Sequence, residues 1–145
     1  MRVLVQRSLN SSVSVDEKVV GSIDKGLVLL VGFTHTDTSE DIDYLIKKVL
    51  NLRVFDDENG IMNKSILDVG DSILSISQFT LYADSKKGNR PSYINAMKGE
   101  DSIKLYNEFN EKLSKYINVE TGIFGADMKL NIINDGPVTI MLESR

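Results

Sequence analysis

The first part of the chain alternates hydrophobic and small polar positions in short runs, a pattern typical of half-buried β-strands. β-Branched residues are frequent in these runs, and the last run is apolar almost throughout, as in a strand covered on both faces. Polar breaks such as Asp16-Glu17 separate neighbouring runs. The pattern therefore predicts strands over Arg2–Ser8, Ser11–Val15, Lys18–Ile23 and Gly26–Phe33.

Two later segments have helical spacing. Thr38-Ser39-Glu40-Asp41 has the composition of a capping box, in which a hydroxyl and a carboxylate three residues later accept hydrogen bonds from free backbone N–H groups. Hydrophobic residues then recur every three or four positions as far as Leu50, which predicts a helix over about residues 39–52. The same spacing from Ile103 to Ile117 predicts a second helix over about residues 101–117.

The remaining segments return to strand patterns. Arg53–Phe55 is short and ends at an acidic turn, whereas Ser72–Leu81 alternates small polar with apolar residues, as a strand with one buried face does. Met128–Asn134 and Val138–Ser144 flank an Asp-Gly pair, which favours a hairpin between them. Because the strands are grouped rather than alternating with helices, we expect an α+β fold with mixed, largely antiparallel sheets. A chain of 145 residues without a linker or repeat is expected to be one domain, residues 1–145.

Composition excludes several kinds of chemistry. The chain has no cysteine and one histidine, so a disulfide framework, a thiol nucleophile, a Cys-ligated metal site and a His-pair metal site are excluded. His35 follows a strand and is interpreted as a surface residue, because no Gly-x-Ser-x-Gly segment accompanies it. The glycines form no phosphate-binding loop. We therefore expect neither a metal nor a cofactor.

Charge and hydropathy bear on partners and location. The net charge of −4 and the pI near 5.0 disfavour a surface that coats nucleic acid, and we expect no DNA partner. The charge is uneven, however, since residues 37–71 carry a net −5 and residues 84–98 a net +3. The first residues lack a signal-peptide core, and the longest apolar run is far below the roughly 20 residues of a membrane helix. We expect a cytoplasmic protein without a membrane partner.

Two motifs are not explained by strand or turn formation alone. Ser77-Gln78-Phe79-Thr80 places three hydrogen-bonding side chains at a strand end beside the positive segment, and Asn134-Asp135-Gly136-Pro137-Val138-Thr139 places a rigid Gly–Pro unit between two strands. With Gln6-Arg7, Gly88-Asn89-Arg90-Pro91-Ser92-Tyr93 and Thr121–Met128, these motifs resemble the D-aminoacyl-tRNA deacylase family, also called D-tyrosyl-tRNA deacylases. The resemblance extends over the full chain.

The resemblance implies a homodimer with active sites at the subunit interface and a barrel-like β core with two main helices outside. It implies hydrolysis of the ester that joins a D-amino acid to the ribose of the terminal adenosine of tRNA, which releases the D-amino acid and free tRNA. In the family the Gly–Pro bond is cis and enters the partner's pocket, so Gly136 and Pro137 would reject L-amino acids there by collision with their carbonyl groups. Glycine has no side chain to reject, so glycyl-tRNA, including glycine mischarged on tRNA-Ala, is an expected side substrate.

The resemblance also assigns roles to single residues. Ser77 and Gln78 would shape the pocket and hold the amino and carbonyl groups of the substrate. The backbone N–H groups around Phe79 and Thr80 would stabilise the oxyanion of the transition state. The other matched positions line the pocket or hold the Gly–Pro unit: Phe124, Met128 and Arg7.

The mechanism stays open between two routes. Thr80 could be a nucleophile, but a hydroxyl needs a neighbouring base, and none is placed in the motif. The alternative uses the 2′-hydroxyl of the tRNA itself together with main-chain donors, and the shortage of histidine and cysteine favours it. A non-catalytic RNA-binding module is a further alternative, disfavoured by the acidic balance and the 7% aromatic content.

Three basic residues, Lys86, Lys87 and Arg90, follow Thr80 within ten positions. In a deacylase of this kind the acceptor stem of tRNA would pass close to that segment. We expect these side chains to contact phosphate groups, which would make binding sensitive to salt.

Overall fold

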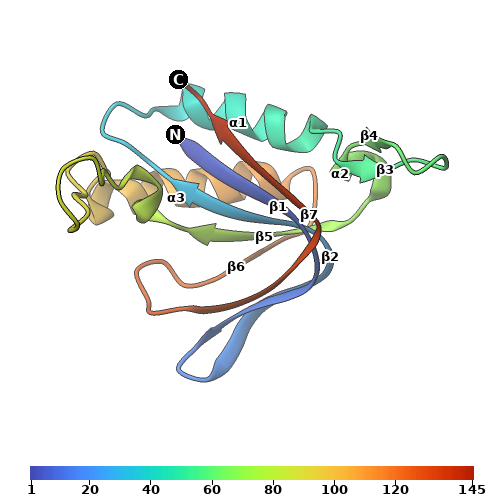
Figure 1. Ribbon diagram of the computed structural model, residues 1–145, viewed down its shortest axis with the longest axis horizontal. Helices are drawn as coiled ribbons and strands as arrows, with labels where there is room; N and C mark the ends of the chain where they lie inside the picture. Colours follow the sequence, from blue (N-terminus) through green and yellow to red (C-terminus); the bar gives the residue numbers. More distant parts are fainter.

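A five-stranded sheet forms the centre of the structure, a computed structural model that describes residues 1–145 (Figure 1). β1 (Arg2–Val15) pairs antiparallel with β2 (Lys18–Gly32) on one side and with β7 (Lys129–Glu143) on the other. Beyond β2, β5 (Ser72–Ser77) and β6 (Val119–Thr121) extend the sheet in parallel orientation. The order β6-β5-β2-β1-β7 confirms a mixed sheet in an α+β fold.

The expected barrel-like core is wrong, because the sheet is open. β6 and β7 are its two edges and do not pair with each other. β6 has only three residues, so it offers too short a ladder for the 15-residue β7 to close a barrel. The predicted pairs of short strands within residues 2–15 and 18–33 are instead two long strands that bend along their length (Figure 1).

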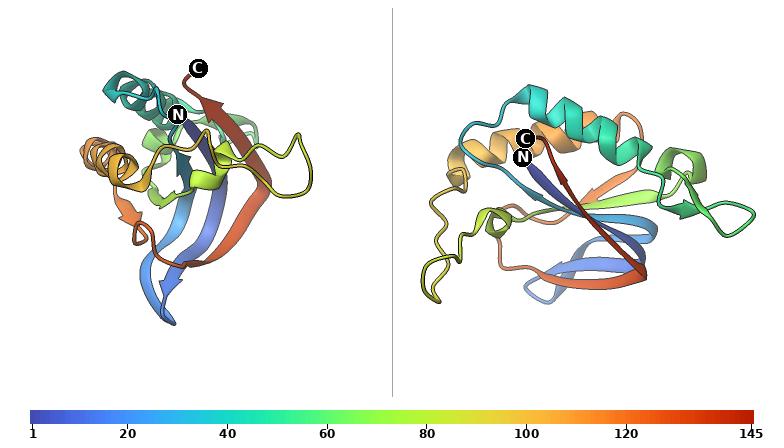
Figure 2. Two further views of the ribbon diagram at one scale, coloured as in Figure 1. Left: turned by 90° about the vertical axis from the view of Figure 1, so that its left-hand side faces the viewer. Right: turned by 45° about the horizontal axis from the view of Figure 1, so that its top comes forward.

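Both predicted main helices are present, and both cover the same face of the sheet (Figure 2). α1 (Ser39–Asn51) and α3 (Gly99–Ser114) pack against each other and enclose a core of 19 buried hydrophobic residues with the strands. A small hairpin of β3 (Phe55–Asp56) and β4 (Met62–Lys64) and the one-turn helix α2 (Ile66–Val69) follow α1. No helix combines the length and the apolar character that a bilayer crossing requires.

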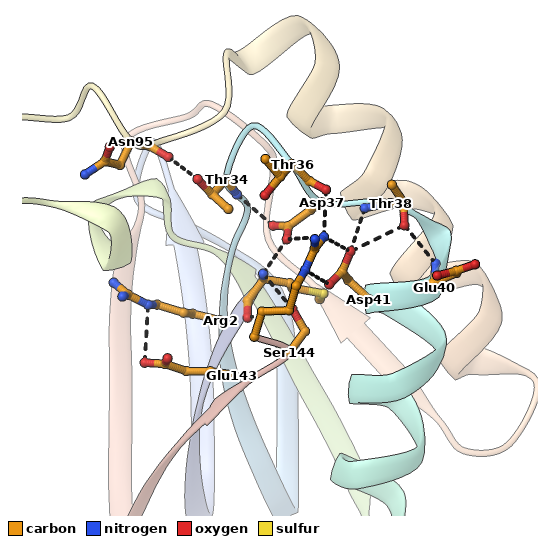
Figure 3. Close-up of polar contacts among 12 residues, drawn as sticks. Arg2, Thr34, Thr36, Asp37, Thr38, Glu40, Asp41, Asn95, Glu143 and Ser144 are labelled. Atoms are coloured by element: carbon orange, nitrogen blue, oxygen red, sulfur yellow. Dashed lines mark hydrogen bonds and ion pairs between the residues drawn. The ribbon is translucent and has the colours of Figure 1, made fainter.

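The start of α1 confirms the predicted capping box and is tied to the end of the chain (Figure 3). Asp41 accepts a 2.8 Å hydrogen bond from the Thr38 N–H and two hydrogen bonds, of 2.8 and 3.1 Å, from the Arg145 guanidinium. Burial alone would raise the pKa of the Asp41 carboxyl, but these hydrogen bonds outweigh burial and hold the pKa well below its usual range. The charged form of Asp41 therefore contributes to the stability of this end of the fold.

A second carboxylate, Asp37, is buried beside the start of β1 (Figure 3). It forms a 2.5 Å ion pair with the amino group of Met1 and accepts a 2.7 Å hydrogen bond from the Thr34 N–H. The Thr34 hydroxyl donates in turn to the Asn95 carbonyl at 2.6 Å. Asp37 thus connects β1 with the segment that leaves β2, and Thr34 connects that segment with the one around residue 95.

The predicted strand over 72–81 is too long. β5 ends at Ser77, and residues Phe79–Tyr82 form the 3₁₀ helix η1. The last bond between β2 and this segment runs from the Gln78 N–H to the Val31 carbonyl at 2.7 Å, after which the backbone of Gln78 leaves the strand conformation. The alternation of polar and apolar residues continues past this point, so the pattern alone could not mark the change.

The predicted hairpin around Gly136-Pro137 is wrong. β7 continues through these residues as one strand, and both of its halves pair with β1, Asn134 with Ser8 and Thr139 with Gln6. Residues 135–138 lie opposite a single residue of β1, so the Gly–Pro unit occupies a bulge. Pro137 lacks an N–H group for a ladder, and a bulge on an edge strand tolerates that loss.

Candidate functional site

A pocket of about 570 Å³ opens where β5 meets η1. Five of the residues singled out from the sequence line it: Ser77, Gln78, Phe79, Phe124 and Met128. The other walls come from the end of β2, from residues 93–102 and from residues 125–130. The structure thus brings the Ser77–Phe79 motif together with a segment that lies about 45 positions later in the chain.

The polar end of the pocket is built by the turn from β5 into η1. The N–H groups of Phe79 and Thr80 are the first two of the 3₁₀ helix, so neither has an acceptor within the helix. Thr80 itself does not line the pocket, and its hydroxyl accepts a hydrogen bond from the Gln78 side-chain amide. The groups beside this end of the pocket are therefore two backbone donors at the start of a helix and an amide, rather than a hydroxyl paired with a base.

Two aromatic residues stand at the pocket, one from η1 and one from the loop after it. The rings of Phe79 and Tyr93 meet edge to face, with centroids 5.2 Å apart and planes at 70°. Both side chains remain open to solvent, with 55% and 43% of the residue exposed. Tyr93 was not among the predicted site residues, and its place in the Gly88–Tyr93 motif was the only signal for it. The exposed pair offers apolar ring surface to a ligand at the pocket.

The apolar end of the pocket is fixed by close packing. Phe124 packs on the buried Tyr106 with ring centroids 5.7 Å apart, and the Tyr106 hydroxyl donates to the Ser75 carbonyl at 2.8 Å. Burial raises the pKa of Tyr106, so this phenol stays neutral and keeps its hydrogen bond. The Met128 sulfur lies 2.5 Å from where a Cβ on Gly122 would be, so a side chain at position 122 would displace the Met128 thioether.

Gly136 and Pro137 do not line the pocket of their own chain. Their peptide bond is cis, both residues are exposed, and they lie in the bulge of β7. Arg7 lies beside them, with its guanidinium 3.2 Å from the Asp135 carboxylate and 2.7 Å from the Val54 carbonyl. Arg7 thus lies next to the Gly–Pro unit, while the pocket and the Gly–Pro unit are separate features of the chain.

Comparison with known proteins decides the family. The family model described as D-Tyr-tRNA(Tyr) deacylase matches residues 4–143. The chain belongs to this family. A curated D-aminoacyl-tRNA deacylase from Clostridium botulinum (strain 657 / Type Ba4) is 58% identical over 100% of this chain and 98% of its own length. That of strain Langeland / NCTC 10281 / Type F is 57% identical over the same shares.

Solved structures agree on the fold of this deacylase-family chain. The structure of a c-Myc DNA unwinding element binding protein superposes with a TM-score of 0.95 at 42% identity, covering 100% of this chain and 99% of the other. A probable eukaryotic D-amino acid tRNA deacylase superposes with a TM-score of 0.85 at 18% identity over 98% of both chains. The second match, at that identity, supports the fold alone.

The pocket of this D-Tyr-tRNA(Tyr) deacylase family member contains no carboxylate, imidazole, amine or guanidinium among its lining side chains. His35 is exposed as predicted, and its Nε2 lies 2.7 Å from the Ile94 carbonyl oxygen. No group of three or more His, Asp or Glu side chains is placed to hold a metal ion. Chemistry in this pocket must therefore use main-chain groups, amides and hydroxyls, or groups of the substrate.

The three basic residues of the positive segment lie on an exposed loop outside the pocket of this deacylase-family chain. Backbone hydrogen bonds of 2.8 Å in both directions between Asp84 and Ser92 close the loop, and it projects from the body of the molecule (Figure 2). Lys86, Lys87 and Arg90 are exposed and form no ion pair within the chain. Their charges are available to an anionic partner.

Proposed function

We propose that the protein hydrolyses the ester bond of D-aminoacyl-tRNA and releases the D-amino acid and free tRNA. Membership in the D-Tyr-tRNA(Tyr) deacylase family and the full-length curated relatives named D-aminoacyl-tRNA deacylase support this activity. The structural observation that carries it is the pair of N–H groups of Phe79 and Thr80 at the start of η1, next to a pocket without an acid or base. An aminoacyl ester is already activated, so positioning and oxyanion stabilisation can suffice for its hydrolysis.

In the proposed mechanism, the ester carbonyl enters at the polar end of the pocket. The N–H groups of Phe79 and Thr80 donate to the oxyanion, and a donor of this kind lowers the barrier by about 2.7–4 kcal/mol in well-studied hydrolases. Gln78 and Ser77 hold the amino and carbonyl groups of the substrate. Water attacks the ester carbonyl with the assistance of the neighbouring 2′-hydroxyl of the tRNA, and the ribose oxygen leaves with the proton that the water gives up. Thr80 is not the nucleophile, because the only partner of its hydroxyl is the Gln78 amide, which is not a base.

Substitution and substrate change separate this route from a Thr80 nucleophile. We expect Thr80→Ala to keep measurable deacylation, whereas a terminal 2′-deoxyadenosine in the D-Tyr-tRNA should stop it. Quenched-flow release of D-tyrosine from both substrates measures the two effects. Loss of all activity in Thr80→Ala, with full activity on the deoxy substrate, would instead establish the nucleophile route.

Chirality selection is proposed to need a second subunit. Gly136 and Pro137 are exposed and lie outside the pocket of their own chain. A homodimer that inserts them into the partner's pocket would bring the Gly–Pro unit and the pocket together in one site. Their carbonyl groups would then face the α-carbon of the substrate and collide with an L side chain. Glycine passes such a filter, so glycyl-tRNA, including glycine mischarged on tRNA-Ala, is a proposed side substrate. The proposed location is the cytoplasm, where tRNA is charged.

The decisive assay is release of tyrosine from D-Tyr-tRNA and L-Tyr-tRNA under the same conditions. We expect hydrolysis of the D ester alone, and equal hydrolysis of both esters, or of neither, contradicts the proposal.

Mixed dimers test the partner's role. A Gln78→Ala subunit and a Pro137→Ala subunit, each defective alone, should regain D-selective activity when combined. One site of the mixed dimer then has an intact pocket and an intact Gly–Pro unit from its partner. No recovery would show that the unit does not act across subunits.

A second candidate function is DNA binding, which the 42% identical c-Myc DNA unwinding element binding protein raises. The net charge of −4 opposes broad contact with a duplex, whose affinity depends on neutralised phosphates. Fluorescence anisotropy with a labelled duplex and with labelled tRNA, at the same salt concentration, discriminates the two. We expect tighter binding of tRNA, and the reverse order would favour the DNA function.

A further inference from the structure

A second pocket, of about 420 Å³, lies beside the first. The two pockets share the structural elements that wall them: η1 contributes Phe79 to the first and Tyr82 to the second, and the segment after the basic loop contributes Tyr93 to the first and Asn95 to the second. The second pocket differs in character, because only two of its eight lining residues are hydrophobic. Its lining residues are Arg2, Thr34, Tyr82, Ala83, Asp84, Ser85, Lys86 and Asn95.

One wall of this second pocket is a fixed stack of a cation on an aromatic ring. The Arg2 guanidinium carbon lies 4.5 Å from the centre of the Tyr82 ring, a distance typical of a cation–π contact. Arg2 is held there by a 2.7 Å hydrogen bond to the Leu81 carbonyl and by Glu143 at 3.4 Å. The Arg2 side chain is still 35% exposed. A planar guanidinium that is fixed and partly open is a surface on which a nucleobase can stack.

The basic loop adds hydrogen-bonding groups and a positive charge to the lining of this pocket. One oxygen of Asp84, Oδ1, accepts a 2.9 Å hydrogen bond from the Lys86 N–H, while Oδ2 has no hydrogen bond and no ion pair. A carboxylate oxygen of this kind accepts from the exocyclic amino group of cytosine. The ammonium of Lys86, on the same loop, is available to a phosphate group.

We propose that this second pocket binds the nucleotide that precedes the terminal adenosine of the tRNA, with a cytosine base stacked on Arg2. The amino group of that base donates to Asp84, and the phosphodiester that links it to the terminal adenosine passes Lys86. This inference rests on the proposed deacylase function, since the first pocket then holds the aminoacylated adenosine and the chain continues past η1. The second pocket would bind the nucleotide next to the aminoacylated adenosine. This explains why the polar second pocket lies beside the apolar first pocket.

Short substrates test this site. The D-tyrosyl esters of adenosine, of the dinucleotide CpA and of UpA present no base, a cytosine and a uracil to the second pocket. We expect kcat/KM of the wild-type protein to rise about 10-fold from adenosine to CpA, the size typical of one stacked base. UpA should gain less, because uracil has no amino group for Asp84. Equal kcat/KM for adenosine and CpA would overturn the proposal.

Substitution of Arg2 distinguishes a binding role from a structural one. Arg2→Gln should lose the gain from CpA while hydrolysing the adenosine ester at the wild-type rate, and Arg2→Lys, which keeps the charge without the plane, should lose most of the gain. Arg53→Gln, at an exposed position outside both pockets, is the matched control and should keep the gain. An Arg2→Gln variant with equal loss on both esters, or with a large fall in thermal midpoint, would make Arg2 structural and overturn the proposal.

Binding of the unacylated ligands separates this proposal from the deacylase function. We expect CpA to bind more tightly than adenosine in titration calorimetry, and the difference to vanish in Arg2→Gln. If no ester is hydrolysed but this difference is found, the deacylase function fails and the second pocket stands. If the esters are hydrolysed but CpA binds no better than adenosine, the second pocket fails alone.

Discussion

Asp37→Asn measures what the buried ion pair at the start of β1 contributes to stability. The Met1 ammonium and the Asp37 carboxylate are 0% and 1% exposed and 2.5 Å apart, and the other acceptor for the ammonium is the Ser144 hydroxyl at 2.9 Å. Loss of the carboxylate charge leaves a buried cation without a counter-charge, which costs about 3–5 kcal/mol in comparable pairs. Because the asparagine oxygen still accepts a hydrogen bond, we expect a loss near the lower end, about 3 kcal/mol.

Urea unfolding at pH 7, followed by circular dichroism, gives this free energy. With a slope of about 2 kcal/mol/M, a loss of about 3 kcal/mol lowers the midpoint by about 1.5 M. The thermal midpoint should fall by about 6–12 °C. Asp43→Asn is the control, because its pair with Lys112 is at the surface, with the Asp43 side chain 63% exposed, and such pairs contribute about 0–1 kcal/mol. Equal losses below about 1 kcal/mol in both variants would refute the reasoning.

Three further predictions concern the pocket, the acid stability and the tRNA contact. A Cβ on Gly32 would lie 2.8 Å from the Gln78 carbonyl oxygen, so Gly32→Ala should shift the polar end of the pocket and lower kcat/KM on D-Tyr-tRNA about 10-fold; unchanged kinetics contradict this. The lowered pKa of Asp41 means that its stabilising charge is present above the usual carboxyl pKa and is lost as the pH falls toward the folded-state value. The difference in urea midpoint between wild type and Asp41→Asn should therefore shrink from pH 5 to pH 2, whereas a constant difference would assign it to packing. Lys86→Glu with Lys87→Glu should weaken tRNA binding and reduce its dependence on salt concentration by a slope of about 1–2, and an unchanged rate and slope would show that these lysines do not meet phosphate.

The elements predicted correctly are those whose signals are local. The start of α1 follows from a capping box, which acts before any tertiary contact forms, and from apolar spacing that can be recognised within a dozen residues. The Asp-Gly pair at 135–136 is an equally local signal, but the hairpin it predicts is absent. Whether two neighbouring runs form a hairpin also depends on which other strand each of them pairs with, and this is not a local property. The whole of β7 follows β1, so the Gly–Pro unit becomes a bulge in a long strand rather than the end of a hairpin.

The residues of the candidate site also divide into those with a local signal in the sequence and those without one. The Ser77–Thr80 motif could be singled out because it places three hydrogen-bonding side chains at a predicted strand end, and Ser77, Gln78 and Phe79 do line the pocket. Tyr93 and Met97 could not, because their loop has no periodicity. They are held at the pocket by distant contacts, such as the 3.0 Å hydrogen bond from the Met97 N–H to the Phe33 carbonyl.

The absence of acidic, basic and thiol side chains from the first pocket determines how the site responds to its surroundings. Reagents that modify imidazoles, carboxylates or thiols have no target among the lining residues, and the pH dependence of the rate should follow the amino group of the ester rather than a residue of the protein. The thioethers of Met97 and Met128 are the only sulfur atoms there. Their oxidation to sulfoxides would bring polar, branched groups into an apolar wall. Peroxide is therefore a reagent to which the lining of this pocket is chemically sensitive.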